Sequence, residues 1–493
     1  MSAFTIGIDI GTTGTKTVLL DLDRGISAEA SREATLHSDQ PGFAEAIPEQ
    51  WLRNVHSSIR QVVAQAGITP HDVASISTSG MVPAVVLLDG SGHPLRRSIL
   101  QNDARAVTQI GALADALVDV DLVTITGSAL TQQSVAPTLA WIAEHEPHIF
   151  SATGFVVGSY DWVLMALGAE PHIERNWAIE SGLFSLVGEI VEPVLRAARI
   201  DRLFFPPLAN SGEQVGTLSH TAAEACGLVA GIPLVVGGAD HVLSAFAAGV
   251  EKNGDWLIKL GGAGDILVAT DRVVVDPRLY LDAHPIPGQW LLNGCMATSG
   301  SLIRWFQTLI GGKELAALDR AATKRPAADL LCLPYFLGEK SPLHDPDLRG
   351  AFAGLHLGHT QADMYRSVLE GIAFGFRHHV EVFRELGITL DRAMITNGGS
   401  KSVLWKQIHA EVLEADMHPV VNHPGASLGA ALIGAVGVSA LNDREEARRF
   451  LTLGEPVRPD PENVARYNEA YREWRELGSA LAPVSHAIAR RQT

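Results

Sequence analysis

Two hairpin-like stretches with glycine-rich turns constrain the fold of this chain more than any other feature. The first, "FTIGIDIGTTGTKTVLLD" (residues 4–21), places glycines and threonines between two short apolar runs. The second, "DWLIKLGGAGDILVAT" (residues 255–270), repeats this form far downstream. Because short apolar runs bounded by turn residues are typical of strands, each stretch predicts strand, turn, strand. Two such hairpins, each opening one half of the chain, predict two similar α/β domains.

The organisation of the rest of the chain agrees with two domains. At 493 residues the chain is too long for one hydrophobic core. A polar stretch at residues 249–255 predicts a boundary, with domains at residues 1–249 and 250–493. Strands are expected within residues 73–89 (two) and 393–399 (one), and the apolar spacing predicts a helix over residues 362–386. The Gly/Ala-rich run at residues 425–441 is too short to span a membrane and predicts a buried helix. The charged tail after Arg444 is expected to be helical.

Composition excludes several classes of protein. The net charge of −17 argues against a nucleic-acid or anionic-membrane binder, which would need a basic face. The chain has three cysteines, Cys226, Cys295 and Cys332, which lie far apart and form no CxxC pair. Neither a disulfide framework nor a zinc motif is therefore expected. No signal-peptide pattern opens the chain, and a cytoplasmic location is expected. The oligomeric state stays open, a homodimer included.

The two glycine-rich turns have the composition of an anion-binding loop. Gly11 and Gly14 permit close backbone approach, the neighbouring threonines offer hydroxyls, and Lys16 adds a positive charge. The alternative is a hairpin that needs glycine only to turn. Neither the Walker A nor the GxGxxG spacing is present. Gly261, Gly262 and Gly264 form a second turn of the same kind. Two such turns on opposing domains could hold a triphosphate from both sides, as in the actin-like ATPase fold.

A carboxylate follows a strand in "GIPLVVGGADHVLSAFAAG" (residues 231–249). Asp240 stands between the apolar strand and the next helix, where ligands bind in open α/β folds. One interpretation is a helix N-cap, which contributes about 1 kcal/mol. The other is a general base that accepts the proton of an attacking hydroxyl. Asp9, at the entrance to the first turn, would suit Mg²⁺, which prefers oxygen ligands.

These motifs resemble those of the FGGY family of carbohydrate kinases, nearest its xylulokinase-like branch. "DIGTTGTK" resembles the first phosphate loop of the family, and "GGADH" resembles its catalytic loop. "LPYFLGEKSPLHDPDLRGAFAGLHLGHTQADMYRSVLEGIAFGFR" and "NGGSKSVLWKQIHAEVLEADMHPV" resemble its C-terminal domain. The resemblance runs from Thr5 to about Gly437. It implies two actin-like (ribonuclease H-like) ATPase domains facing an interdomain cleft, and a phosphotransferase that uses ATP with Mg²⁺ to phosphorylate a hydroxyl of a small sugar or polyol.

The resemblance also implies a role for each site residue. Asp240 would be the catalytic base and Asp9 the metal ligand. The sugar would contact Met81, Val82, Asn102, Asp103 and Arg105. The nucleotide would be bound by Thr12, Thr13, Gly14, Lys16, Gly262, Ala263, Gly264, Gly300, Arg304, Gly399 and Val403.

Four positions depart from the family pattern. Ala263 stands where many relatives have Thr or Ser, which removes one hydroxyl contact to phosphate. Val82 and Pro83 replace the His and the Gly of the Met-His-Gly run of typical xylulokinases, and Gln101 replaces a Trp. We therefore expect that D-xylulose is a poor substrate or not the best one, and that another ketopentose or a related polyol is preferred; a D-xylulose-specific xylulokinase is the alternative. An actin-like ATPase without a sugar substrate is a second alternative, which Asp240 together with the polar cluster at Asn102, Asp103 and Arg105 disfavours.

Overall fold

The computed structural model describes residues 4–492, apart from the side chains of Leu203 and Glu445. It contains two compact units. Unit 1 comprises the described residues up to Gly249 together with Val275–Trp290 and Pro424–Phe450. Unit 2 comprises Val250–Val274, Leu291–His423 and the residues from Leu451 onward. The first break follows Gly249, but two later segments pack with the N-terminal part, so two contiguous halves do not describe the compact units.

Unit 1 is built on a six-stranded sheet with the order β11-β12-β5-β1-β2-β3. The strands are β1 (Phe4–Ile10), β2 (Gly14–Asp21), β3 (Gly25–Glu33), β5 (Val73–Gly80), β11 (Gln214–Thr217) and β12 (Pro233–Ala239). β1 and β2 form the predicted antiparallel hairpin, and β1, β5 and β12 run parallel. The register aligns Ile10 with Gly80 and Gly80 with Ala239. The carboxyl ends of three parallel strands therefore meet at one edge of the sheet.

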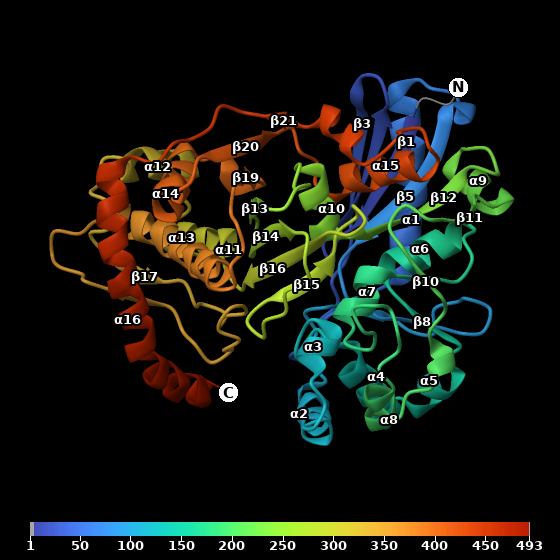
Figure 1. Ribbon diagram of the computed structural model, residues 1–493, viewed down its shortest axis with the longest axis horizontal. Coiled ribbons are helices and arrows are strands. Elements are labelled where there is room, and N and C mark those ends of the chain that lie inside the picture. The colour runs from blue at the N-terminus through green and yellow to red at the C-terminus, as the bar shows by residue number, and fades with distance from the viewer. Residues whose placement is uncertain (1–3, 493) are drawn as a thin grey trace. The chain divides into compact units, whose positions relative to one another are not determined.

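Helices cover both faces of this sheet. The predicted buried helix is confirmed as α15 (Ala426–Gly437), which lies against β1 and β5 (Figure 1, red against blue). It can approach closely because Gly7 has no side chain: a Cβ there would lie 1.9 Å from the carbonyl oxygen of Ser427. On the opposite face packs α1 (Pro48–Ala66), where the hydroxyls of Thr17 and Ser58 are 2.6 Å apart. α10 (Asp240–Ala247) follows β12 directly.

The remaining elements of unit 1 are shorter and surround the sheet. They are β4 (Glu45–Ala46), β6 (Val86–Leu88), β7 (Ser98–Ile99), α2 (Val107–Ala116), α3 (Leu122–Thr126), α4 (Val135–His145), α5 (Pro147–Ala152), β8 (Phe155–Val157), α6 (Ser159–Leu167), β9 (Ile173–Glu174), α7 (Arg175–Glu180), α8 (Glu192–Ala198), β10 (Leu208–Ala209), α9 (His220–Cys226) and β15 (Tyr280–Ala283). Short 3₁₀ turns lie at residues 70–72, 202–204 and 445–450.

Unit 2 repeats the same plan. Its strands β13 (Asp255–Leu260), β14 (Gly264–Thr270), β16 (Trp290–Met296), β19 (Arg392–Thr396), β20 (Met417–Val421) and β21 (Thr452–Leu453) follow the order β16-β14-β13-β19-β20-β21. β13 and β14 form the second predicted hairpin, and β13 runs parallel to β19. The order β14-β13-β19-β20 of unit 2 thus matches β2-β1-β5-β12 of unit 1.

The predicted long helix is confirmed as α13 (Gln361–Glu385), the orange helix in Figure 1. The other elements of unit 2 are α11 (Gly300–Leu309), α12 (Leu315–Ala322), β17 (Leu331–Leu333), β18 (Ala351–Ala353), a 3₁₀ turn at Gly398–Lys401, α14 (Val403–Leu413) and α16 (Pro461–Gln492). The tail is helical from Pro461, whereas the segment just after Arg444 is a 3₁₀ turn and a short strand. None of the described helices is both long and apolar enough to cross a bilayer.

Candidate active site

The carboxyl edge of the unit 1 sheet brings together loops from distant parts of the sequence. The backbone N–H of Met81, after β5, donates to the carbonyl of Ile10 at the end of β1 (3.2 Å). The Thr12 hydroxyl lies 3.7 Å from the Met81 sulfur. The Gln101 side-chain amide, which comes from the loop after β7, donates to the same hydroxyl (3.4 Å). A residue predicted to bind phosphate and two from the predicted sugar loops therefore share one cluster.

Asp240 lies at this same edge, directly after β12. It is the first residue of α10, and the N-cap position belongs to Ala239, which makes no side-chain capping bond. The interpretation of Asp240 as an N-cap is therefore wrong. Its side chain is 38% exposed, so the carboxylate is accessible. An accessible carboxylate beyond the end of a parallel strand has the position and chemistry of a proton acceptor.

Asp9 and Lys16 face each other across the first hairpin. They are register partners of an antiparallel pair, so both side chains lie on the same face of the sheet. The Lys16 ammonium pairs with Glu29 on β3, at 2.9 Å. Lys16 could therefore contact a phosphate only if it broke its exposed ion pair with Glu29. The Asp9 carboxylate offers the oxygen ligands that Mg²⁺ prefers, so the residue present fits the predicted ion.

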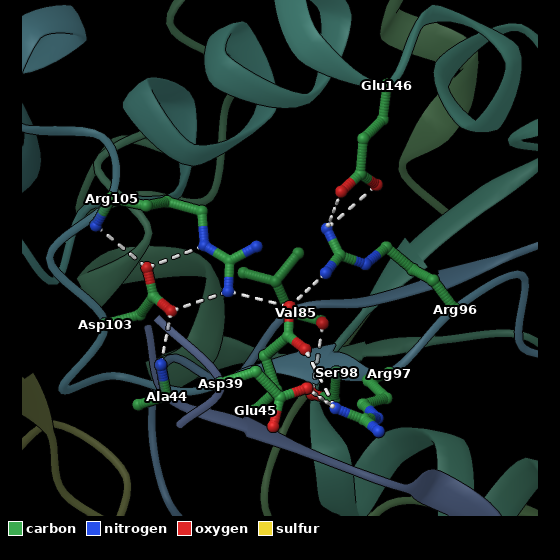
Figure 2. Close-up of polar contacts among 10 residues, drawn as sticks. All are labelled: Asp39, Ala44, Glu45, Val85, Arg96, Arg97, Ser98, Asp103, Arg105 and Glu146. Carbon is green, nitrogen blue, oxygen red and sulfur yellow. Dashed lines mark hydrogen bonds and ion pairs between the residues drawn. The ribbon is translucent and has the colours of Figure 1, made fainter. Parts of the chain in front are cut away.

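Asp103 and Arg105 occupy a buried ionic network, which Figure 2 shows. The Arg105 Nε donates to Asp103 Oδ1, and Nη2 donates to Asp103 Oδ2, both at 2.8 Å. Nη2 also donates to Glu45 Oε1 at 2.7 Å. The backbone N–H of Arg105 donates to Asp103 Oδ1 at 2.9 Å, and the backbone N–H of Ala44 donates to Asp103 Oδ2 at 2.6 Å. Each oxygen of Asp103 therefore accepts two hydrogen bonds from protein, which is the full capacity of a carboxylate.

The network extends to further charged residues. The Glu45 carboxylate also accepts a hydrogen bond from Arg96. Arg96 in turn forms an ion pair with Glu146 at 3.0 Å. The Arg105 guanidinium lies 3.8 Å from the centre of the Phe43 ring, a cation–π contact. Burial lowers the pKa of Arg105, and the carboxylates of Asp103 and Glu45 raise it, with a net rise. The Arg105 side chain therefore stays charged and fixed in position.

Some hydrogen-bonding groups in these loops have no partner among the described residues. Gln101 Oε1 is buried and accepts no hydrogen bond from the described residues, and Arg105 Nη1 is likewise buried without an acceptor among them. Asn102 is exposed, whereas Val82 is 5% exposed and apolar. A buried acceptor and a buried donor without partners are suited to hydroxyls of a ligand.

The residues of unit 2 predicted to bind nucleotide gather around its own hairpin turn. The backbone N–H groups of Ser299 and Ser301 donate to the Gly262 carbonyl at 2.9 and 3.0 Å, and that of Gly300 donates to Gly261 at 2.8 Å. A Cβ at Gly300 would lie 2.5 Å from the Gly261 oxygen. The start of α11 is thus packed against the turn, and its first N–H groups are already bonded.

Gly399 lies beside the same turn. A Cβ there would lie 2.6 Å from the Cβ of Leu260 and 2.3 Å from the Trp405 ring, so only glycine fits. Ala263 and Arg304 are exposed, and Val403 is 76% exposed at the start of α14. The structure therefore brings Gly262, Gly300 and Gly399 together. Gly264 is buried beside Phe376, whereas Ala263, Arg304 and Val403 are at the surface. Their nucleotide contacts stay predictions.

Sequence reasoning missed one cluster beside Asp240. His241, Glu180 and Asp282 converge in unit 1, although they come from α10, α7 and β15. Asp282 is fully buried and lies 41 residues from His241 in sequence. No spacing rule connects them, so only the adjacency of His241 to Asp240 could have drawn attention to this place.

Comparison with known proteins identifies the class. The N-terminal domain of the FGGY family of carbohydrate kinases matches residues 4–247, and its C-terminal domain matches residues 270–438. The chain belongs to the FGGY family of carbohydrate kinases.

The similarity to known proteins extends over nearly the whole chain. It is 27% identical to a xylulose kinase of Bacillus subtilis over 98% of both chains. It is 26% identical to a probable L-xylulose kinase of Pasteurella multocida, over 97% of this chain and 98% of the relative. The crystal structure of a xylulose kinase from Rhodospirillum rubrum is 39% identical, with a TM-score of 0.90, covering 98% of this chain and 100% of the other.

Family membership settles the general activity. The enzyme is a phosphotransferase with an alcohol acceptor, and it phosphorylates a sugar with ATP. The predicted α/β fold with two sheet domains is confirmed, as is the resemblance to the xylulokinase-like branch. The less favoured alternative of an actin-like ATPase without a sugar substrate is therefore wrong.

Proposed function

We propose that this kinase phosphorylates a ketopentose and that Asp240 is the general base. The observation that carries the proposal is the accessible Asp240 carboxylate at the sheet edge shared by Thr12, Met81 and Gln101. A hydroxyl bound near Asp240 would give up its proton to this carboxylate as its oxygen attacks the γ-phosphorus of ATP. The bond between the γ-phosphorus and the β–γ bridging oxygen breaks, and ADP leaves.

The sugar would be held by Met81, Val82, Asn102 and the neighbouring ionic pair. The unpartnered Gln101 Oε1 and Arg105 Nη1 offer one acceptor and one donor to its hydroxyls. Asp103, whose oxygens are fully used, would act by fixing Arg105.

The proposed ATP contacts lie at each of the two glycine-rich turns and at a few residues outside them. We propose phosphate contacts from Thr12, Thr13, Gly14 and Lys16 and from Gly262, Ala263 and Gly264, with Gly300, Arg304, Gly399 and Val403 beside the nucleoside. Asp9 would hold Mg²⁺, directly or through water, and the ion when bound neutralises charge on the phosphates. Backbone N–H groups of the glycine-rich turns would stabilise the same charge.

The Asp240→Asn variant tests the base. Asparagine keeps the size of the side chain but cannot accept the proton, so turnover should fall by about 10² to 10⁴. The affinities for ATP and sugar should stay nearly unchanged. Asp119→Asn, an exposed aspartate of the same unit, is the control. If Asp240→Asn kept about half of the wild-type turnover or more, proton transfer to Asp240 would not be part of the reaction.

The identity of the sugar depends on Val82 and Gln101. Val82 offers no hydrogen bond, so a hydroxyl that relied on the His of typical xylulokinases would be buried unpaired. This costs about 1–3 kcal/mol, which corresponds to a loss of affinity of roughly fivefold to 150-fold. Gln101 adds an amide instead. We propose that a ketopentose of different hydroxyl stereochemistry is preferred over D-xylulose. The likeness to a probable L-xylulose kinase is in line with this choice.

A panel of ketopentoses, ketohexoses and pentitols tests the preference. The double variant Val82→His with Gln101→Trp should move kcat/KM toward D-xylulose. A wide preference of the unmodified enzyme for D-xylulose would instead make it a plain xylulokinase. We further propose a cytoplasmic enzyme, since its three cysteines are all free thiols. Sedimentation of the purified chain would decide between a monomer and a homodimer.

A further inference from the structure

His241, the residue after the proposed base, bridges two carboxylates. Its Nδ1 lies 3.4 Å from Asp240 Oδ1, and its Nε2 lies 3.0 Å from Asp282 Oδ2. The Glu180 carboxyl is 3.6 Å from the same Nε2. The imidazole therefore connects an accessible carboxylate to a fully buried one.

The buried side of this cluster is held by unit 1 itself. The side-chain amide of Asn176 on α7 donates to the Ala283 carbonyl at 3.0 Å and accepts from the Ala283 N–H at 2.7 Å. This paired contact fixes β15 against α7. Asp282 and Glu180 are therefore fixed in position around the His241 ring.

Charge in the cluster favours a protonated imidazole. Burial lowers the pKa of His241, but Asp282, Asp240 and Glu180 raise it, with a net rise well above the usual value. Burial, together with the Asp282 charge, raises the pKa of Glu180, which favours its neutral form. These three acids face His241 from its own helix and from the two elements packed against it. Glu174, at the start of α7, interacts with Asp282 rather than with the ring.

The same three ligand types could be taken for a metal site. However, the 3.0 Å distance from Nε2 to Asp282 fits an N–H···O hydrogen bond, which a protonated Nε2 would donate to the carboxylate. A protonated ring nitrogen has no lone pair for a metal ion. The geometry therefore favours an ion pair over metal coordination.

We propose that His241 is a positioning residue for the proposed base: Asp282 holds the imidazolium, and the imidazolium holds Asp240 ionised and in place. The inference rests on the proposed role of Asp240. A positive charge within about 4–6 Å favours the ionised form of a carboxylate, lowering its pKa by about 1–3 units. The base then stays ready to accept a proton at a lower pH than an isolated carboxylate would.

The test is the pH dependence of kcat in His241→Gln. Glutamine keeps a hydrogen-bond donor of similar size but carries no charge. The midpoint of the acidic limb should rise by about 1–3 pH units, while turnover at alkaline pH recovers and the KM for the sugar changes little. His172→Gln is the control, since His172 is a buried histidine of unit 1 that lies 3.6 Å from a carboxylate, that of Asp161. It should leave the limb in place.

The outcomes separate this inference from the proposed function. If Asp240→Asn is inactive but the acidic limb of His241→Gln does not move, the role of His241 is wrong and the base assignment stands. If Asp240→Asn remains active, the base assignment is wrong, and this inference falls with it.

A second measurement covers the case in which His241→Gln does not fold. In the unmodified enzyme labelled with ¹⁵N at histidine, His241 should have both ring nitrogens protonated at neutral pH. Its signal is the one whose titration moves to lower pH in Asp282→Asn. A neutral His241 ring at neutral pH, or no histidine that responds to Asp282→Asn, would overturn the proposal.

Discussion

Replacement of Arg105 by methionine tests whether the network of Figure 2 is structural. The guanidinium makes three side-chain hydrogen bonds of 2.7–2.8 Å to Asp103 and Glu45. Arg105 and Asp103 side chains are 1% and 3% exposed, and Glu45 is 12% exposed. Methionine keeps most of the apolar stem that packs near Phe43, but it leaves both carboxylates without this partner.

The expected loss of stability is large because the charges are buried. Removing one partner of a buried ion pair costs about 3–5 kcal/mol, since the remaining charge is left uncompensated. For a unit of this size, about 1 kcal/mol corresponds to roughly 2–4 °C, so the melting temperature of unit 1 should fall by roughly 6–20 °C. The exposed pair Arg202–Glu192, at 68% and 47% exposure, provides a matched comparison. Arg202→Met should cost less than about 1 kcal/mol.

Differential scanning calorimetry and urea unfolding of both variants would measure these effects. Sugar KM measured below the unfolding transition gives the functional part, to which the unpartnered Arg105 Nη1 contributes. A weakened KM with unchanged stability in Arg105→Met would refute the structural reasoning and make Arg105 only a substrate ligand. A loss equal to that of Arg202→Met would refute it as well.

Three further predictions follow from other parts of the chain. Gly7→Ala should cost at least about 2 kcal/mol in urea unfolding, because its Cβ would meet the backbone of α15, whereas Gly90→Ala, which has open space, should be nearly neutral. Burial raises the pKa of Glu339 to about 7, so the folded chain keeps a proton that the unfolded chain releases above about pH 4.5. Stability should therefore fall by about 3 kcal/mol as pH rises through this window, and Glu339→Gln should remove that fall in unfolding curves from pH 4.5 to 7.5. Asp9→Ala should raise the Mg²⁺ concentration needed for half-maximal turnover without changing sugar preference, and an unchanged magnesium titration would contradict the Asp9 assignment.

Local patterns were enough to predict the elements that frame the site. Both glycine-turned hairpins and the helix α13 follow from the spacing of apolar and turn residues within one short window. The placement of residues 275–290 and 424–450 with unit 1 does not, because it depends on contacts between distant segments. The contact of Gly7 with the backbone of α15, more than 400 residues away, is one example. No window of sequence contains both partners.

In the site, too, local sequence predicts some features, and contacts between distant residues determine the others. Asp240 could be located from its own neighbours, since a strand, a carboxylate and a helix follow one another in sequence. The partners of Asp103 and Arg105 could not, because Glu45 comes from 60 residues before Arg105. The sequence therefore predicted that Asp103 and Arg105 bind the sugar, although most of their hydrogen bonds are made within the protein.

The hydrogen-bonding capacity that is left over limits how this enzyme can choose its sugar. Asp103 has no free lone pair, and Val82 has no polar atom, so neither can distinguish one hydroxyl from another by a hydrogen bond of its own. In these loops, the buried groups without a partner among the described residues are the Gln101 Oε1 acceptor and the Arg105 Nη1 donor, and the exposed Asn102 amide is a further polar group. The stereochemistry that satisfies this acceptor and this donor together is the one that the site should prefer. Because Gln101 also donates to Thr12, a sugar that reorients its amide would disturb the loop proposed to hold the phosphates. Sugar choice and phosphoryl transfer would therefore be coupled through a single side chain.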